Sequence, residues 1–269
     1  MRRFSSPLRT LGHPGPCLPA RSRRAVASLR ATGSALLASL ALAACGPVWN
    51  DPYPAAERGE HILYTAFTER PKHLDPVQSY SEDEATFTAQ IYEPPLQYHY
   101  LKRPYTLIPA TAEAVPEPRY FDAAGRKLPV NAPASQIAFS DYEIRIRPGI
   151  RYQPHPAFAL DAGGAPLYAD LNRQKLRGIE RIADFAHTGT RELTADDYIY
   201  EIKRLAHPRL NSPLFSTMSE RIVGLKELGE QLRAEATAHP EYWLDLDRFA
   251  LEGVTRVDRY TYRIRLHGK

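Results

Sequence analysis

Two stretches in which apolar and charged side chains alternate predict a pair of β-strands. In residues 142–147, tyrosine and isoleucine alternate with glutamate and arginine, and Pro148 and Gly149 follow directly. Residues 260–266 repeat the pattern, with tyrosine, isoleucine and leucine separated by threonine and arginine. A side-chain period of two places one face of a strand in a core and the other in water. Because both stretches have the same pattern, we expect them to share a sheet.

Residues 194–208, which lie between these strands, have the pattern of one amphipathic helix. Thr194 is a suitable N-cap, and Asp197 three residues later completes something close to a capping box. Acids at the start and bases at the end complement the helix dipole: Asp196, Asp197, Lys203, Arg204 and His207. The apolar stripe consists of Ile199, Ile202, Leu205 and Ala206. Pro208 is expected to end the helix. We interpret the two aspartates as helix N-terminal charges and not as a catalytic pair.

Shorter patterns divide the rest of the chain, and together they predict an α/β fold. We expect a first strand over residues 61–67, and helices over residues 85–92, 171–186 and 221–233. The last of these helices is interrupted by glycine. Residues 77–84 and 211–218 are expected to be loops, and residues 123–126 to form a turn.

The charge distribution separates a basic leader from the rest of the chain. Seven of the 35 Lys and Arg residues lie in residues 1–44, which contain no acid. From Cys45 onward 28 bases face 31 acids, a net charge of −3. The overall charge of +4 therefore belongs to the leader, and we expect no nucleic-acid partner.

The leader has the pattern of a bacterial export signal. A basic segment with a long, Pro-rich prelude precedes the uncharged residues 31–44, a run too short to span a bilayer but suited to a signal peptide. Small residues then precede Cys45, as in a lipobox, which predicts cleavage before Cys45 and its lipidation. An ordinary secretory signal or a short membrane anchor is the alternative. Residues 45–60 are predicted to be a lipidated, Pro-rich tether.

No pattern of residues predicts catalysis or a metal site. Cys17 and Cys45 are the two cysteines, and neither falls in the domain after the tether. The nine histidines show no helical His-x-x-x-His pairing, and neither Gly-x-Ser-x-Gly nor a phosphate-binding glycine loop is present. We therefore expect a protein that is not an enzyme, with no catalytic residue, cofactor or metal.

Several short motifs resemble the extracellular solute-binding proteins of ABC transporters, family 5, the oligopeptide, dipeptide and nickel class. They are Leu74-Asp75-Pro76, the strand end Arg147-Pro148-Gly149, the run from Leu193 to Asp197, the run from Lys203 to Pro208, and Gly253-Val254 with Asp258, Tyr260 and Thr261. The resemblance implies a type II periplasmic-binding-protein fold. Over residues 61–269 it covers only an incomplete first lobe with its small subdomain, and the second lobe is absent.

The chain departs from the pattern of that family in several places. Pro94 stands where the family usually has a glycine, so a turn with positive φ is impossible there. About 38 residues separate His155 from Thr194, where the family has only a few. The resemblance also implies that segments which would cover this lobe are missing. We therefore expect a strand left unpaired at the sheet edge, an exposed apolar face and marginal stability.

The resemblance implies capture of a peptide or a similar solute in the periplasm and delivery to an ABC permease in the inner membrane. The loop after Leu74-Asp75-Pro76 would reach the ligand and pair with its main chain, which gives Ser79, Tyr80, Ser81 and Glu82 as ligand contacts. The protein would be periplasmic and anchored to the membrane by its lipid. The alternative is a truncated lipoprotein that acts as a structural or partner-binding module without transport.

Overall fold

The computed structural model describes residue 56 and residues 59–269, and it divides the chain into two units, residues 1–65 and 66–269. The predicted signal peptide, Cys45 and most of the tether lie outside the described residues. Among the residues that are described, no helix is both long enough and apolar enough to cross a membrane. The elements discussed below all belong to the second unit.

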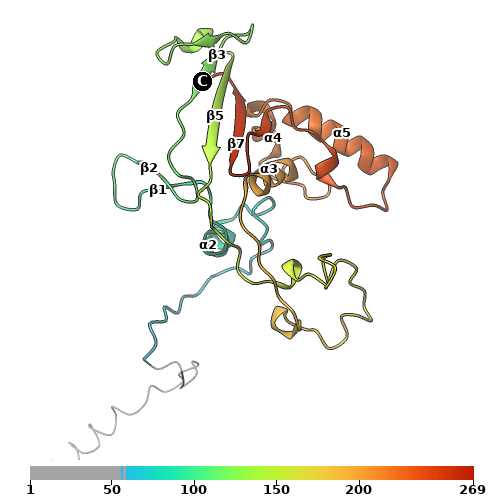
Figure 1. The fold of residues 1–269 in the computed structure, drawn as a ribbon. Coiled ribbons are helices and arrows are strands. Elements are labelled where there is room, and N and C mark those ends of the chain that lie inside the picture. The colour runs from blue at the N-terminus through green and yellow to red at the C-terminus, as the bar shows by residue number, and fades with distance from the viewer. Residues whose placement is uncertain (1–55, 57–58) are drawn as a thin grey trace, which may run out of the picture. The chain divides into compact units, whose positions relative to one another are not determined.

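A five-stranded sheet in the order β4-β3-β5-β7-β6 is the centre of the second unit (Figure 1). Its strands are β3 (Arg119–Phe121), β4 (Lys127–Leu128), β5 (Phe139–Arg145), β6 (Val254–Arg256) and β7 (Thr261–His267). The long strands β5 and β7 pair antiparallel, with Tyr142 opposite Ile264. The prediction that the two alternating stretches share a sheet is therefore confirmed.

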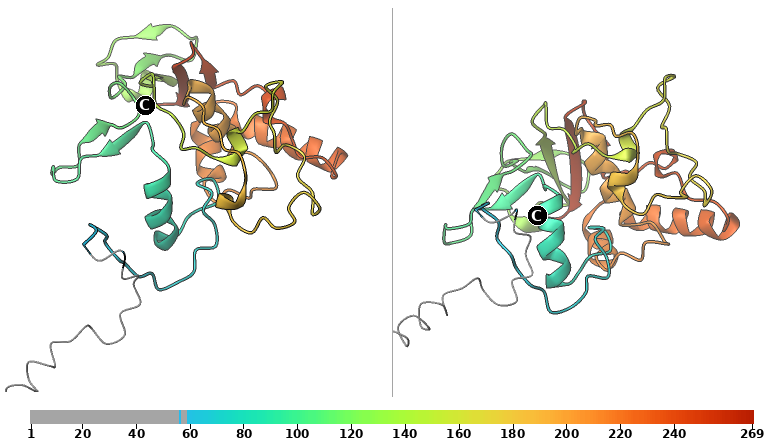
Figure 2. Two further views of the ribbon diagram at one scale, coloured as in Figure 1. Left: turned by 60° about the horizontal axis from the view of Figure 1, so that its bottom comes forward. Right: turned by 90° about the horizontal axis from the view of Figure 1, so that it is seen from below.

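Three helices gather beside β6 and β7 (Figures 1 and 2): α3 (Ala195–Arg204), α4 (Phe215–Arg221) and α5 (Leu225–Ala238). Their apolar faces and the inner face of the sheet form the main hydrophobic core, in which Ile146, Leu225, Leu228, Leu232 and Tyr262 are almost fully buried. A second, small cluster lies at the other end of the sheet, around Tyr120, Ala132 and Ile137. The fold is mixed α/β, as the sequence predicts.

Two further elements lie outside the large sheet. Helix α2 (Glu82–Ile91) is followed by a two-stranded hairpin of β1 (Leu96–Tyr98) and β2 (Leu107–Pro109). Short 3₁₀ turns complete the unit: Ala134–Gln136, Pro156–Phe158, Ile182–Asp184 and Leu246–Arg248. The turn predicted over residues 123–126 joins β3 to β4, and Gly125 has φ 76° there.

Residues 171–186 do not form the predicted helix. Only Ile182–Asp184 makes a 3₁₀ turn. The side chain of Asn172 accepts hydrogen bonds from the N–H groups of Gln174 and Lys175, and Gly178 has φ 83°. Local bonds of this kind compete with a helix, and exposed apolar side chains such as Ile182 find no surface to pack against.

Other boundaries also differ from the prediction. Residues 61–67 form no strand, since no described strand pairs with them. Helix α2 begins at Glu82, so the predicted loop over residues 77–84 ends early, and α4 begins at Phe215, inside the loop predicted over residues 211–218. Glycine divides the helix predicted over residues 221–233: Gly224 adopts φ 78° between α4 and α5.

Helix α3 ends at Arg204, four residues before Pro208. His207, which we expected to carry a positive charge at the helix end, is buried, and burial lowers its pKa. The large sheet ends in β4 and β6, strands of two and three residues. Each of these two strands pairs along one side only, as the edge strands of any open sheet do. The expectation of a strand left unpaired at the sheet edge stays a prediction.

Candidate functional site

The candidate site is the segment of residues 74–84, here called the 74–84 loop, which ends in the first turn of α2. It contains all four residues that the resemblance implies as ligand contacts. Ser79 and Tyr80 precede the helix, Ser81 is its N-cap, and Glu82 is its first residue. The structure thus brings the four together at the N-terminal end of one helix.

Glu84 organises this loop, although the sequence analysis did not single it out. Its side chain is buried, and its carboxylate accepts four backbone N–H groups: those of Lys72 at 3.0 Å, His73 at 2.8 Å, Tyr80 at 3.0 Å and Ser81 at 3.3 Å. Hydrogen bonds to the charged form favour it, so these donors, that of Tyr80 foremost, lower the pKa of Glu84 to about 2. The signal that could have identified it is the capping-box spacing from Ser81 to Glu84.

An ion pair joins the loop to α3. The guanidinium of Arg204 donates to both carboxylate oxygens of Asp75, at 3.0 Å for the Nη1–Oδ1 bond. The amide of Gln78 donates to the carbonyl of Leu210 at 3.0 Å, and Val77 is 1% exposed. The hydrogen bonds to Asp75 and Glu201 raise the pKa of Arg204, against the opposing effect of its burial. Two motifs that carry the family resemblance, 129 residues apart in sequence, therefore meet in space.

Most backbone donors of the loop are already used. The N–H of Ser79 donates to the carbonyl of Asp75, and those of Tyr80 and Ser81 donate to Glu84. A peptide would thus meet side chains and carbonyl groups here, not the N–H row of a free strand. Tyr80 is 75% exposed and Glu82 is also exposed, so both side chains are accessible. Their role as ligand contacts stays a prediction.

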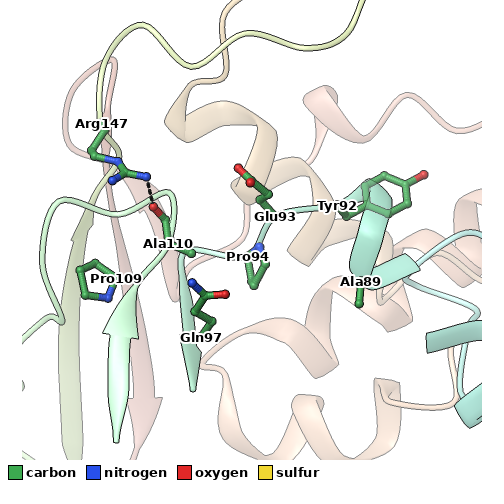
Figure 3. A pocket seen from close by; sticks show the side chains of 8 residues that line it. All are labelled: Ala89, Tyr92, Glu93, Pro94, Gln97, Pro109, Ala110 and Arg147. Atoms are coloured by element: carbon green, nitrogen blue, oxygen red, sulfur yellow. Dashed lines mark hydrogen bonds between the residues drawn. The ribbon is translucent and has the colours of Figure 1, made fainter. Parts of the chain in front are cut away.

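A pocket of about 350 Å³ lies at the other end of α2 (Figure 3). Its walls come from the end of α2, the base of the hairpin and the segment after β5: Ala89, Tyr92, Glu93, Pro94, Gln97, Pro109, Ala110 and Arg147. The guanidinium of Arg147 donates to the carbonyl of Ala110. Ser79, Tyr80, Ser81 and Glu82 do not line this pocket.

The two aspartates at the start of α3 are held in structural interactions. Asp197 accepts the N–H of Thr194 at 2.8 Å and its hydroxyl at 3.2 Å, and it pairs with Arg191. Asp196 forms an ion pair with Arg256, with 3.2 Å between the carboxylate Oδ2 and the guanidinium Nη1. These partners fit the predicted role of helix N-terminal charges. Within the described residues, no group of three or more potential ligands could hold a metal ion.

The comparisons with known proteins give a weak likeness only. No family model matches the chain, and no curated protein matches it. Among solved structures, the peptide-binding pheromone receptor PrgZ is similar at a TM-score of 0.39 and 16% sequence identity. The match covers 74% of this chain and 26% of that receptor. The chain thus spans about a quarter of the receptor's length, and so weak a likeness establishes neither fold nor function.

Proposed function

We propose that the chain is the solute-binding component of an ABC importer, which captures oligopeptides or similar solutes in the periplasm for transport by a permease. The observation that carries the proposal is the Asp75–Arg204 contact. Asp75 belongs to the family's Leu-Asp-Pro motif, and Arg204 belongs to its Lys-Arg-Leu-Ala-His-Pro motif. The two motifs are far apart in the sequence, yet these residues form one bidentate ion pair. That contact supports the interpretation that the motifs belong to a single architecture and did not arise by chance.

The geometry of the 74–84 loop suits a rigid ligand contact. Glu84, Asp75 and Gln78 fix the loop through hydrogen bonds to three different parts of the chain. A fixed loop loses little conformational entropy when a ligand binds. Tyr80 offers a flat apolar face with a polar tip, and the carboxylate of Glu82 would attract the ammonium of a peptide.

A thermal-shift screen of the full chain with a peptide library tests the proposal. A ligand that binds only the folded state stabilises it by about 2.7 kcal/mol at a hundredfold excess over Kd. We expect a subset of peptides to raise the Tm, and Tyr80→Ala with Glu82→Gln to reduce the rise. Tyr242→Ala, which removes another exposed tyrosine, should leave it unchanged.

If no peptide raises the Tm, the oligopeptide proposal is rejected. A shift by another class of small solute would keep the importer role and change the substrate. If no solute of any class raises the Tm, the result would favour the alternative, a lipoprotein that acts as a structural or partner-binding module without transport.

A further inference from the structure

The tip of the β1–β2 hairpin, residues 98–105, exposes an unusual concentration of large apolar side chains. Tyr100 is 89% exposed and Leu101 is 76% exposed, and Tyr98 and Tyr105 are also mostly exposed. Single exposed apolar residues are normal on the surface of a soluble protein, whereas a cluster of them marks a site of interaction.

The charge of this hairpin is opposite to that of the domain. Residues 94–112 contain no Asp or Glu, and their charged residues are Lys102 and Arg103. Neither forms an ion pair with a described residue, and the Arg103 guanidinium lies 4.5 Å from the ring centre of Tyr105. The chain from Cys45 onward has a net charge of −3. An anionic surface would therefore attract the hairpin and repel the rest of this part of the chain, which would orient the hairpin toward the surface.

The hairpin is a fixed feature and not a loose loop. Its two ends are joined, because the N–H groups of Ala110 and Ala112 both donate to the carbonyl of Pro95. Ala112 connects this base to the main core, in which it is fully buried, and it bridges to Ile146. At the tip, the imidazole Nδ1 of His99 accepts the N–H groups of Leu101 and Lys102 at 3.2 Å each. Figures 1 and 2 show the hairpin projecting away from the large sheet and its helices. The apolar tip thus has a defined shape and no cover from those elements.

We propose that this hairpin tip docks onto an anionic phospholipid surface. Tyrosine rings concentrate at the level of lipid headgroups, where one end is apolar and the other is wet. Leu101 would enter the acyl boundary, while Lys102 and Arg103 would pair with lipid phosphates. Docking would be an additional contact beside any lipid anchor, and it does not depend on which solute the protein binds.

Co-sedimentation of the full chain with vesicles tests the proposal, using phosphatidylcholine with and without phosphatidylglycerol. The leader contributes equally to every variant, so differences between variants report the hairpin. We expect Tyr100→Ser with Leu101→Ser to lower the partition coefficient roughly tenfold or more. Removal of one cation by Lys102→Gln should lower it about fivefold on the anionic vesicles only, and high salt should abolish that difference. Val130→Ser, at a site 76% exposed outside the hairpin, is the matched control.

Depth-dependent quenching gives a second, local readout. Tryptophan introduced as Tyr100→Trp should be quenched by brominated lipids beyond the parent chain, whereas Val130→Trp should not. Equal partition of the hairpin and control variants, or equal quenching at both positions, would overturn the proposal. So would a concentration-dependent dimer that the hairpin variants abolish, or a peptide whose binding they abolish without any change in vesicle partition.

Discussion

At the scale of single residues, Glu84 accepts more backbone N–H groups in the candidate site than Asp75, which the sequence motifs indicated. The Glu84 carboxylate satisfies four backbone N–H groups of the segment that leads into α2. An unpaired buried donor costs free energy, so replacement of Glu84 should disturb the loop as well as the helix start.

The pH dependence of stability provides the test for Glu84. The folded-state pKa of about 2 lies below the ordinary value of 4.5. The stabilisation is therefore present above about pH 4.5 and is lost as the pH falls from there toward about 2. We expect Glu84→Gln to lower the Tm at neutral pH and to flatten the acid slope. Glu82→Gln, on the exposed side of the same turn, should retain the parent's slope, and an unchanged slope in Glu84→Gln would contradict the assignment.

His207 should produce a separate slope at higher pH. Its Nδ1 accepts the N–H of Arg209, its Nε2 has no hydrogen-bond partner among the described residues, and its ring stacks on Trp243 at 4.5 Å. Burial, and then the cations of Arg209 and Arg204, lower its pKa from the ordinary 6.5. The unfolded chain therefore takes up this proton first, and stability falls as the pH decreases below about 6.5.

Urea unfolding between about pH 7.5 and about pH 5 measures this effect. We expect His207→Gln to lose less stability over that interval than the parent chain. His239→Gln, at a mostly exposed position, is the control and should behave as the parent does. A parent-like loss in His207→Gln would show that another group titrates in this interval.

A double-mutant cycle measures the ion pair that supports the proposed function. Asp75 and Arg204 are each about one-quarter exposed, so solvent screens the pair in part. We expect Asp75→Asn or Arg204→Met alone to cost about 1–2 kcal/mol of unfolding free energy, and the coupling to be about 1 kcal/mol. Glu201→Gln removes the other partner of Arg204, 2.8 Å away, and should cost less. A coupling free energy of zero between Asp75 and Arg204 would remove the structural argument that the two motifs belong to one architecture.

At the scale of elements, the sequence was informative where a periodic pattern continued over several residues. The alternation in β5 and β7 predicted their pairing, and the capping pattern at Thr194 placed the start of α3 correctly. Burial does not alternate along β7, where Thr261 is buried beside Tyr262. It was misleading where local side-chain bonds replace regular structure, as at Asn172 and Gly178. The Glu84 network could not be predicted in full, because two of its donors lie 11 and 12 residues away, in a segment without any periodic pattern.

The packing of the α4–α5 junction against β6 depends on Gly253. A Cβ there would lie 2.4 Å from the carbonyl oxygen of Val223, a backbone atom that cannot swing aside. The N–H of Gly253 also donates to that carbonyl at 2.9 Å. We expect Gly253→Ala to cost about 1–3 kcal/mol by overpacking. Gly163→Ala, where the added Cβ meets only a side-chain oxygen at 3.3 Å, should be close to neutral in urea unfolding.

At the scale of the whole molecule, the two hydrophobic clusters differ greatly in size. The main core joins α3, α4, α5 and the strands β5 and β7, whereas the outer cluster contains three buried residues and the partly buried Leu128. The free energy gained by burying apolar side chains is roughly proportional to the apolar area removed from water. The small cluster around Tyr120 therefore contributes much less to stability than the main core. The marginal stability that we expected for the chain stays a prediction. Large apolar side chains such as Leu63 and Trp243 are exposed, which agrees with low stability but is not a measurement of stability.

Native-state hydrogen exchange measures how stability is distributed within the second unit. Local opening requires less free energy where few apolar contacts are broken. We therefore expect the amides of β3 and β4 to exchange by local opening, orders of magnitude faster than those of Ile144 and Tyr262, which lie opposite each other in the β5–β7 pair and are buried in the main core. Tyr120→Ala should accelerate exchange in β3 and leave the slowest amides of α5 almost unchanged. If the outer and central strands had equal protection, the sheet would unfold as one cooperative unit, and the small cluster would be as firmly held as the main core.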